Sequence, residues 1–563
     1  MVTELTLEGL WDFCPDPDEC GQVDDWATHW PKGRRPCVLP LPWNLMDPTL
    51  FKYEGTVWFF RTVPSLSPGE WWIAGDGVNH RVTAWADGVL LGSHEGGYLP
   101  FEFAMPRRET TGPVRLTLAV DNRLGPKTLP PAGADWFNWG GVVRRLCLRA
   151  RPPVRLADVK TGCTLSGALR VEGRVAGRGA EACRVKARLL DADGASVWDA
   201  QASPQVDIDG ACFSLSGSLS GPRLWSPDQP EMYTLVVHVA GGGETEGDVR
   251  TLPIGFREVR VEGCRILLNG RPIRLRGISR HEAYPHVGNA GIDQLAFADL
   301  MLLKRAGANL VRLAHYPHDP HVLDLADRLG ILVFAELPTV WLGEEQMADP
   351  DVLTRAVATY DALWRRDRHH PSIILWGLLD ECATRTEAGE RFFARLAAEV
   401  RQRDPGRLIT QASETPDGDR CYQYSDVLGL NYFHGWYADA PIAEYGEALD
   451  RLHANFPDKP ILLSSHGADA IAGFRSFHGA KWSEEAQAAY HAAVIAEVRR
   501  RPFVAGQSIW LLADYQGPAW RTARFTPLQR PKEQNNKGLL DEYRRPKLAY
   551  DRVQALYRAW ADE

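Results

Sequence analysis

The chain has 563 residues, of which 44% are hydrophobic and 24% are charged, and its net charge at pH 7 is −8. A single hydrophobic core stops growing near roughly 250–300 residues, so this length predicts several domains. The mild acidity, without any block of lysines and arginines, argues against nucleic acids and anionic membranes as partners. No apolar run approaches the roughly 18–20 residues of a membrane span.

The ten cysteines are scattered along the chain, without a CxxC pair or a disulfide-framework spacing. Reduced thiols are the simplest explanation of such a pattern. The N-terminal segment carries acidic residues early and lacks the apolar core of a signal peptide. We therefore expect a cytoplasmic protein without a cofactor. The sequence leaves the subunit number open, with a homo-oligomer as one option.

The first 151 residues are predicted to form a β-sandwich. Short alternating strands, such as residues 56–62, 81–85 and 114–121, are separated by glycine, proline and Asp-Gly turns. After the linker Pro152-Pro153, residues 152–260 repeat this pattern and predict a second sandwich of immunoglobulin size.

Residues 261–563 are predicted to form a (β/α)8 TIM barrel, because apolar strand-length runs now alternate with amphipathic helical segments. Catalytic residues of such a barrel lie at the C-terminal ends of its strands. The helical segments include residues 293–306, 351–366, 387–403 and 483–500. The eight predicted strands are residues 273–279, 309–314, 332–336, 372–379, 408–412, 427–432, 460–464 and 504–510.

Two adjacent carboxylates, Asp380 and Glu381, end the fourth predicted strand. A buried acid without a partner is costly, so such a pair needs an explanation. Where water is excluded, the two groups would push each other's pKa values apart, leaving one protonated as a general acid. The alternative is a salt-bridged pair at the barrel rim. The location favours the catalytic interpretation.

Polar and aromatic residues also follow the sixth and eighth strands, in segments 431–437 and 510–515. Three histidines, His315, His318 and His321, follow the second strand. Their spacing matches no familiar metal motif, and an intervening proline prevents helical presentation. We therefore predict histidines that line a pocket, and no metal.

Six segments carry a family resemblance: residues 96–103, 277–282, 311–317, 369–381, 431–437 and 481–490. They resemble glycoside hydrolase family 2 and, within it, the β-glucuronidases. The resemblance runs over essentially the whole length and implies a jelly-roll sandwich, an immunoglobulin-like sandwich and a TIM-barrel catalytic domain. It also implies hydrolysis of a glycoside in a small carbohydrate or glycoconjugate.

Two features of the resemblance imply a uronic acid. Asn535 and Lys537 resemble the Asn-x-Lys motif that holds the glucuronate carboxylate, and an ammonium beside an amide N–H suits that task. Asp135 resembles an N-terminal-domain aspartate that reaches the same pocket. Arg530 would add a second cation, in a loop one residue longer than the family pattern. The alternative for Lys537 is a solvated loop lysine. The remaining predicted substrate-binding residues are His315, Asn431, Tyr437 and Trp510.

The retaining mechanism of the family needs an acid/base after strand four and a glutamate nucleophile after strand seven. Glu381 matches the acid/base, but Ser465 occupies the nucleophile position and His466 the neighbouring tyrosine position. Asp380 replaces an asparagine, and Phe433 replaces a tyrosine. A serine hydroxyl is a poor nucleophile at an anomeric carbon, so these changes together indicate a remodelled site.

Three interpretations remain open. The favoured one is hydrolysis with Glu381 as acid and a water activated by His466, Asp380 or Asp469, an inverting layout with carboxyl groups roughly 6.5–9.5 Å apart. The second is an inactive uronate-binding descendant. The third is an elimination in which Lys537 stabilises the developing charge and His466 or Asp380 is the base. Hydrolysis ranks first because the acid, the carboxylate-binding motif and the aromatic residues all persist.

Overall fold

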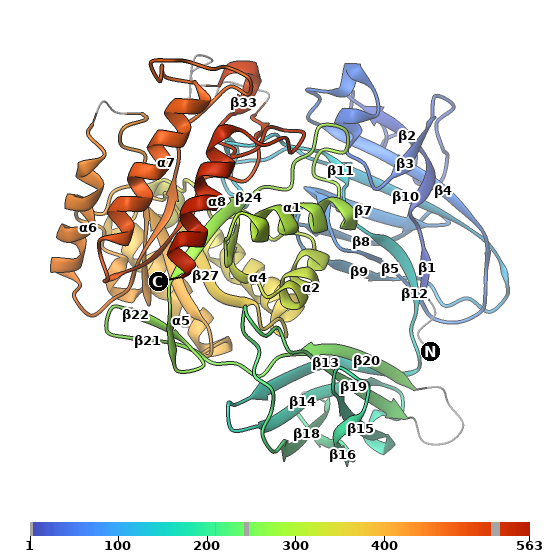
Figure 1. Cartoon of the computed structure of the whole chain (residues 1–563). Coiled ribbons are helices and arrows are strands. Elements are labelled where there is room, and N and C mark those ends of the chain that lie inside the picture. Colours follow the sequence, from blue (N-terminus) through green and yellow to red (C-terminus); the bar gives the residue numbers. More distant parts are fainter. Residues whose placement is uncertain (1–3, 209, 241–246, 438–439, 519–529, 563) are drawn as a thin grey trace. The chain divides into compact units, whose positions relative to one another are not determined.

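The computed structural model describes residues 4–208, 210–240, 247–437, 440–518 and 530–562 (Figure 1). The chain forms two compact units. The first comprises Met1–Arg123, Gly140–Glu258 and Arg365–Pro371, and the second comprises Leu124–Trp139, Val259–Trp364 and Ser372–Glu563. The segment Leu124–Trp139 is predicted to lie within the first domain, yet it packs with the barrel unit. The three-domain division of the chain stays a prediction.

The first unit contains two β-sandwiches, and several of their strands, such as residues 184–190 and 233–240, alternate between buried and more exposed residues. The first sandwich pairs the sheet β3-β2-β4-β10-β7-β8 with the sheet β1-β12-β5-β9, and the two-stranded sheet β11-β6 adjoins them. Its strands are β1 (Glu4–Thr6), β2 (Gly9–Asp16), β3 (Arg35–Leu39), β4 (Thr56–Leu66), β5 (Trp71–Gly75), β6 (Val78–Asn79), β7 (Arg81–Ala86), β8 (Val89–Glu95), β9 (Phe101–Ala104), β10 (Gly112–Asp121), β11 (Gly141–Val142) and β12 (Leu146–Ala150).

The second sandwich pairs the sheets β13-β14-β18-β17 and β16-β15-β19-β20 around a core of valines, leucines and phenylalanines. Its strands are β13 (Val154–Cys163), β14 (Ala168–Gly177), β15 (Arg184–Leu190), β16 (Ser196–Ala202), β17 (Gln205–Asp207), β18 (Gly210–Ser218), β19 (Tyr233–Ala240) and β20 (Asp248–Ile254). A small antiparallel sheet, β21 (Val259–Glu262), β22 (Arg265–Leu268) and β23 (Arg271–Ile273), precedes the barrel.

Eight parallel strands close into a barrel in the second unit, so the predicted fold class is confirmed. All residues of these strands except Arg276 are buried, because helices cover the outer surface of such a barrel. They are β24 (Leu275–Arg280), β25 (Leu310–Leu313), β26 (Leu332–Glu336), β27 (Ile373–Asp380), β28 (Leu408–Ser413), β29 (Val427–Asn431), β30 (Ile461–His466) and β31 (Val504–Ile509).

The helices follow the predicted segments closely. In α5, the Thr386 side chain accepts from Gly389 N, and acidic residues lie in the first turn with arginines in the last, which suits the helix dipole. The helices are α1 (Asp293–Arg305), α2 (Pro320–Leu329), α3 (Glu344–Ala348), α4 (Pro350–Asp367), α5 (Glu387–Arg403), α6 (Ala443–Asn455), α7 (Glu484–Arg499) and α8 (Leu548–Ala561).

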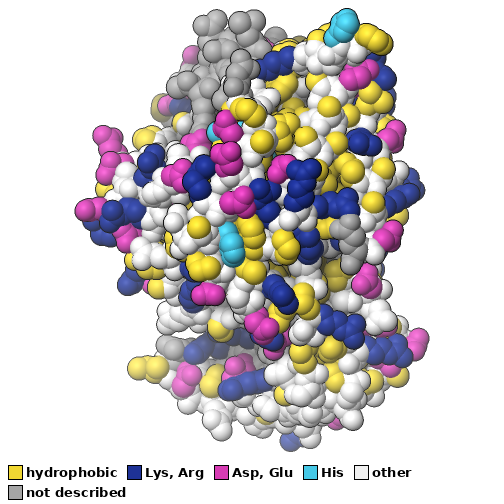
Figure 2. All heavy atoms as spheres, turned by 60° about the vertical axis from the view of Figure 1, so that its left-hand side comes forward, with side chains coloured by type: hydrophobic (Ala, Val, Ile, Leu, Met, Phe, Trp, Pro, Cys, Tyr) yellow, Lys and Arg dark blue, Asp and Glu magenta, His cyan; other side chains and the backbone are white. Residues whose placement is uncertain are grey.

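Acidic and basic side chains are interspersed over the face drawn in Figure 2, in keeping with the small net charge. Within the described part of the chain, none of the helices combines the length and the apolarity that a bilayer crossing requires.

Candidate active site

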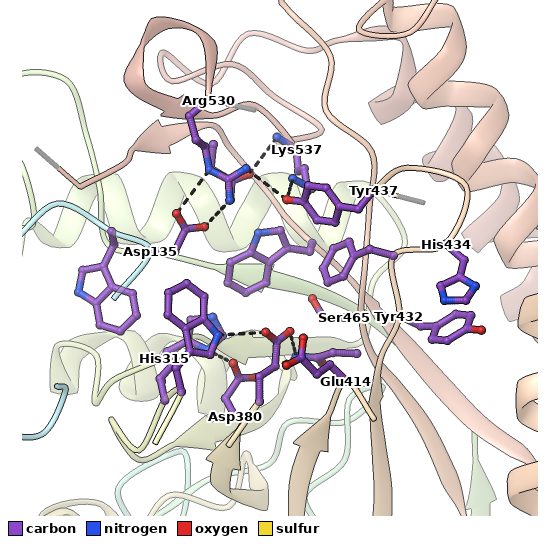
Figure 3. A pocket seen from close by; sticks show the side chains of 18 residues that line it. Asp135, His315, Asp380, Glu414, Tyr432, His434, Tyr437, Ser465, Arg530 and Lys537 are labelled. Atoms are coloured by element: carbon purple, nitrogen blue, oxygen red, sulfur yellow. Dashed lines mark hydrogen bonds and ion pairs between the residues drawn. The ribbon is translucent and has the colours of Figure 1, made fainter. Parts of the chain in front are cut away.

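A cavity of about 410 Å³ opens among the loops that follow the barrel strands (Figure 3). All of its lining residues belong to the barrel unit, including two from the segment Leu124–Trp139. The lining is rich in carboxyl groups and aromatic rings, and it contains two cations. It consists of Asp135, Trp136, His315, Val340, Trp341, Asp380, Glu381, Glu414, Asn431, Tyr432, Phe433, His434, Tyr437, Ser465, Trp510, Arg530, Asn535 and Lys537.

Glu381 follows directly after β27 and lines this cavity. Two neutral donors hold its carboxyl group: Asn431 Nδ2 donates to Oε1 at 2.9 Å, and Trp341 Nε1 donates to Oε2 at 3.0 Å. These two hydrogen bonds fix the orientation of the carboxyl group in the cavity wall. An oriented carboxyl group that lines a cavity is suited to donate a proton to a bound ligand.

Asp380 lies next to Glu381 in the chain but in a different environment. Its Oδ1 lies 2.6 Å from Arg312 Nη2 and 3.0 Å from Asn431 Nδ2. Burial raises the pKa of the Asp380 carboxyl, but the charges of His315 and Arg312 outweigh burial and hold that pKa below its usual value. Asp380 is therefore salt-bridged, as the alternative interpretation of the pair expects, whereas Glu381 faces the cavity.

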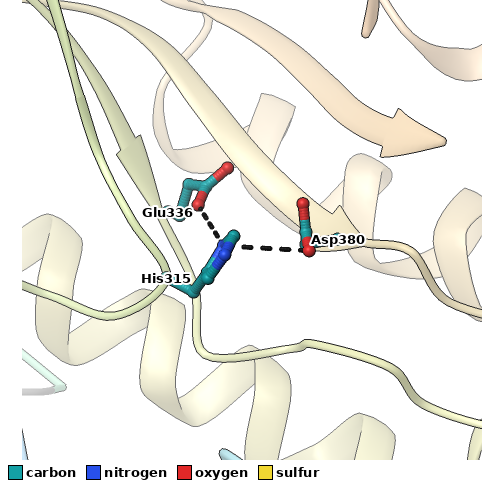
Figure 4. A group of neighbouring side chains, drawn as sticks. All are labelled: His315, Glu336 and Asp380. Atoms are coloured by element: carbon teal, nitrogen blue, oxygen red, sulfur yellow. Dashed lines mark hydrogen bonds and ion pairs between the residues drawn. The ribbon is translucent and has the colours of Figure 1, made fainter. Parts of the chain in front are cut away.

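His315, Glu336 and Asp380 form a buried group whose potential ligand atoms lie within 4.8 Å of one another (Figure 4). His315 Nδ1 is 3.0 Å from Glu336 Oε2, and Arg312 Nη2 is 2.7 Å from Glu336 Oε1. Because the Arg312 guanidinium pairs with both carboxylates, the chain itself supplies the positive charge that a metal ion would bring. The contacts fit a buried ion-pair network.

The opposite part of the cavity holds a cationic cluster, which we define as Tyr437, Arg530 and Lys537. Lys537 Nζ donates to the Tyr437 hydroxyl at 2.6 Å, and Arg530 Nη1 donates to it at 3.2 Å. Arg530 Nη2 also lies 2.5 Å from Asp135 Oδ2, which anchors the guanidinium. Asn535 Nδ2 donates to the Tyr515 hydroxyl at 3.1 Å. Lys537 is only 1% exposed, so it is not a solvated loop lysine.

Aromatic rings form the walls between Glu381 and the cationic cluster. The His315 ring stacks on Trp510, with ring centroids 4.8 Å apart, and on Trp136, at 5.8 Å. Phe433 and Tyr437 contribute a further wall, with centroids 5.7 Å apart. Flat apolar faces of this kind suit the stacking of a sugar ring.

Ser465 lines the cavity from the end of β30, and its hydroxyl is directed into it (Figure 3). No hydrogen bond of this hydroxyl is found within the described ranges. Its backbone carbonyl accepts from Tyr432 N at 2.9 Å, which fixes the strand end. The predicted nucleophile position thus presents a small hydroxyl to the cavity.

His466 does not line the cavity, so we do not propose it as the base. Side chains alternate along a strand, and Ser465 already takes the inward direction. The His466 ring lies instead 5.6 Å from the His491 ring of α7. Burial lowers the pKa of His466 well below its usual value. Asp469, the third predicted base, is not in the lining either and pairs with Lys537 Nζ at 2.5 Å.

The structure adds seven cavity residues to the site residues predicted from the sequence: Trp136, Val340, Trp341, Glu414, Tyr432, Phe433 and His434. Glu414 lies one residue beyond β28, so the rule that barrel sites lie at strand ends could have found it. Trp136 adjoins Asp135, and Tyr432 and His434 lie in a segment already noted as polar and aromatic. Trp341 lies in the loop that follows β26, so the same rule places it near the site, but its hydrogen bond to Glu381, 40 residues later, could not be predicted from the sequence.

A closed barrel with an oriented carboxyl group, aromatic walls and a cationic cluster in one cavity is the arrangement of a carbohydrate-active enzyme domain. The family described as "Glycosyl hydrolases family 2, TIM barrel domain" matches residues 259–559, and "Glycosyl hydrolases family 2" matches residues 154–257. The chain therefore belongs to glycosyl hydrolases family 2.

Relatives and solved structures agree with this assignment. The chain is 31% identical to a β-glucuronidase of Paenibacillus borealis, over 96% of this chain and 95% of the relative. It is 29% identical to the human β-glucuronidase, over 99% of this chain and 91% of the relative.

Among solved structures, the Ruminococcus gnavus β-glucuronidase superposes with a TM-score of 0.88 at 26% identity, covering 99% and 98% of the two chains. The Eisenbergiella tayi β-galacturonidase bound to galacturonate superposes with a TM-score of 0.87 at 29% identity, covering 99% and 97%.

Proposed function

We propose that this glycoside hydrolase cleaves β-linked uronic acid glycosides of the glucuronide type, with Glu381 as the general acid. One observation carries the proposal: the same cavity holds a carboxyl group oriented by neutral donors and a cationic cluster. The names of the relatives support this substrate class, since they are β-glucuronidases and a β-galacturonidase.

The cationic cluster is the proposed binding site of the uronate carboxylate. The Tyr437 hydroxyl accepts from both Lys537 and Arg530, so the two cations converge on one part of the cavity wall. A carboxylate placed there meets the ammonium charge of Lys537 and the guanidinium charge of Arg530. The sugar ring would then stack between the aromatic walls, with its glycosidic oxygen toward Glu381.

Glu381 then donates its proton to the glycosidic oxygen as the bond from that oxygen to the anomeric carbon breaks. With a serine at position 465, a water molecule can occupy the space beside the opposite face of the sugar. The water oxygen bonds to the anomeric carbon, and a base takes the water proton. The products are the free sugar, with inverted configuration, and the leaving alcohol.

Glu414 is our candidate for the base. Of the other cavity carboxylates, Asp380 is a weak base because Arg312 and His315 lower its pKa, and Asp135 is paired with Arg530. Glu414 lines the cavity from the end of the neighbouring strand β28. This placement at a strand end, in the same cavity as Glu381, is what supports the role.

The second candidate function is uronate binding without turnover, which the Ser465 hydroxyl at the predicted nucleophile position favours. Elimination is the third interpretation. Of its two predicted bases, His466 lies outside the cavity and only Asp380 lines it.

Proton NMR of the purified protein with aryl β-glucuronide and aryl β-galacturonide separates the three. We expect the α-anomer of the free sugar to appear first, and the faster substrate identifies the preferred epimer. Saturable binding without product would show that the protein binds the uronate without cleaving it. An unsaturated sugar product that absorbs in the ultraviolet would show that the reaction is an elimination. The variant Glu381→Gln is the control and should bind without turning over.

A further inference from the structure

Two of the residues that should bind the uronate, Asn535 and Lys537, lie in one short segment, Asn535–Gly538, which we call the clamp loop. Only its first residue belongs to a strand, β33 (Gln534–Asn535), which pairs with β32 (Tyr515–Gln516). Backbone polar groups of a buried loop need partners from elsewhere in the fold. The partners of this loop lie behind it, on the side away from the cavity.

Lys547 supplies one set of partners. Its Nζ donates to Asn536 O at 3.0 Å and to Ala470 O at 2.8 Å, and it pairs with Asp514 Oδ1 at 2.8 Å. The same Oδ1 accepts from Gly538 N at 2.8 Å. Lys547 is 1% exposed and does not line the cavity. One buried ammonium thus joins the clamp loop to the segments that follow β30 and β31.

Gln487, on α7, supplies the second set. Its Nε2 donates to Lys537 O at 3.3 Å, to Gly538 O at 3.1 Å and to Ala468 O at 2.9 Å. Gln487 is fully buried and lies outside the cavity lining. Together, Lys547 and Gln487 donate hydrogen bonds to the carbonyl oxygens of three consecutive clamp-loop residues, Asn536, Lys537 and Gly538.

Asp469 and the neighbours of Gly538 restrain the clamp loop further. Asp469 Oδ1 accepts from Asn536 N at 3.0 Å, and Asp469 Oδ2 pairs with Lys537 Nζ at 2.5 Å. Gly538 has no room for a side chain, because an added Cβ would meet Asp514 N and Leu540 O at 2.3 Å. Residues outside the cavity lining therefore fix the backbone of the clamp loop, while the Lys537 side chain reaches the cavity.

We propose that Gln487 and Lys547 are positioning residues that set the affinity for the uronate carboxylate without touching it. This inference rests on the proposed role of the cationic cluster. Binding groups must be held within a fraction of an ångström by their supporting shell, and a displacement of about 1 Å can cost two orders of magnitude in activity. Loss of either set of donors would let Lys537 move away from its position beside Tyr437.

The test measures the dissociation constants of methyl β-D-glucuronide and methyl β-D-glucoside for the full chain by calorimetry. The variants are Gln487→Met and Lys547→Met, each made in the wild type and in Lys537→Met. Gln487→Met leaves the ion pair of Lys547 with Asp514 intact, so it provides a folded variant. Lys547→Arg tests rescue by a second cation. Asp404→Asn is the control, since it disturbs a buried ion pair with Arg407 that has no contact with the clamp loop.

We expect each methionine variant to weaken glucuronide binding about tenfold or more, with glucoside binding unchanged. In the Lys537→Met background the same substitutions should have no further effect, because they act through Lys537. Equal losses for both ligands, or losses that persist without Lys537, would overturn the inference, as would a wild type that binds no glucuronide. Selective binding by a wild type that shows no hydrolysis would overturn the proposed function alone.

Discussion

Replacing Lys537 with methionine separates the two tasks that its ammonium performs. Toward the cavity it lies 2.6 Å from the Tyr437 hydroxyl, and behind the cavity it pairs with Asp469 Oδ2 at 2.5 Å. A hydrogen bond to a charged group contributes about 1.5–3 kcal/mol, so affinity for a uronate should fall roughly 10- to 150-fold. Asp469 is 0% exposed, and removing the partner of a buried charge destabilises a protein by about 3–5 kcal/mol.

The double variant Lys537→Met/Asp469→Asn distinguishes these effects. An asparagine retains an oxygen for the bond from Asn536 N and removes the unpaired buried charge, so stability should largely return. Affinity for the glucuronide should not return, because the cation is still missing. Urea unfolding measures the first quantity, and kcat/KM for aryl glucuronide against aryl glucoside measures the second. The matched control is Lys532→Met, whose side chain is 49% exposed. If affinity recovered together with stability, Lys537 would be a structural residue and the carboxylate site would lie elsewhere.

Three further predictions concern proton transfer and pH. Glu381→Gln should lower kcat by about 10²- to 10⁴-fold for alkyl glucuronides and much less for a dinitrophenyl glucuronide, whose departure needs no proton, and equal losses would contradict the acid role. Glu414→Gln should lower kcat for both substrates alike, since water activation is common to them; unchanged rates would remove Glu414 as base. Burial lowers the pKa of His466 well below its usual value and that of His491 to about 3. Below the unfolded-state pKa near 6.5, these histidines are protonated in the unfolded chain but stay neutral in the folded chain. The free energy of unfolding is therefore highest above that pH and falls as the pH is lowered. Urea unfolding between pH 8 and 5 should show this loss, by up to about 1.4 kcal/mol per pH unit for each histidine, and His491→Phe should flatten it; an unchanged slope would show that the ring is not buried in its neutral form.

Much of the barrel could be predicted from sequence because its signals are local. A short, mostly apolar strand and a capped amphipathic helix follow from neighbouring residues alone, and the predictions for residues 332–336 and 387–403 coincide with β26 and α5. The acid Glu381 was also predictable, since parallel strands bring their C-terminal ends to one side of a barrel. A strand end with two carboxylates is visible without any coordinates.

The sequence by itself therefore determined the order of strands and helices, the family, and which loops carry chemically active side chains. Only the tertiary structure decided which partners each of these side chains has and whether it lines the cavity, because both depend on contacts between distant segments. Asp380 is an ion-pair partner of Arg312, 68 residues earlier, whereas Glu381 accepts hydrogen bonds from Asn431 and Trp341. Ser465 took the inward direction of its strand and His466 the outward one. The type of a residue does not specify which distant residue it will contact in the folded chain. Long-range packing determines those contacts.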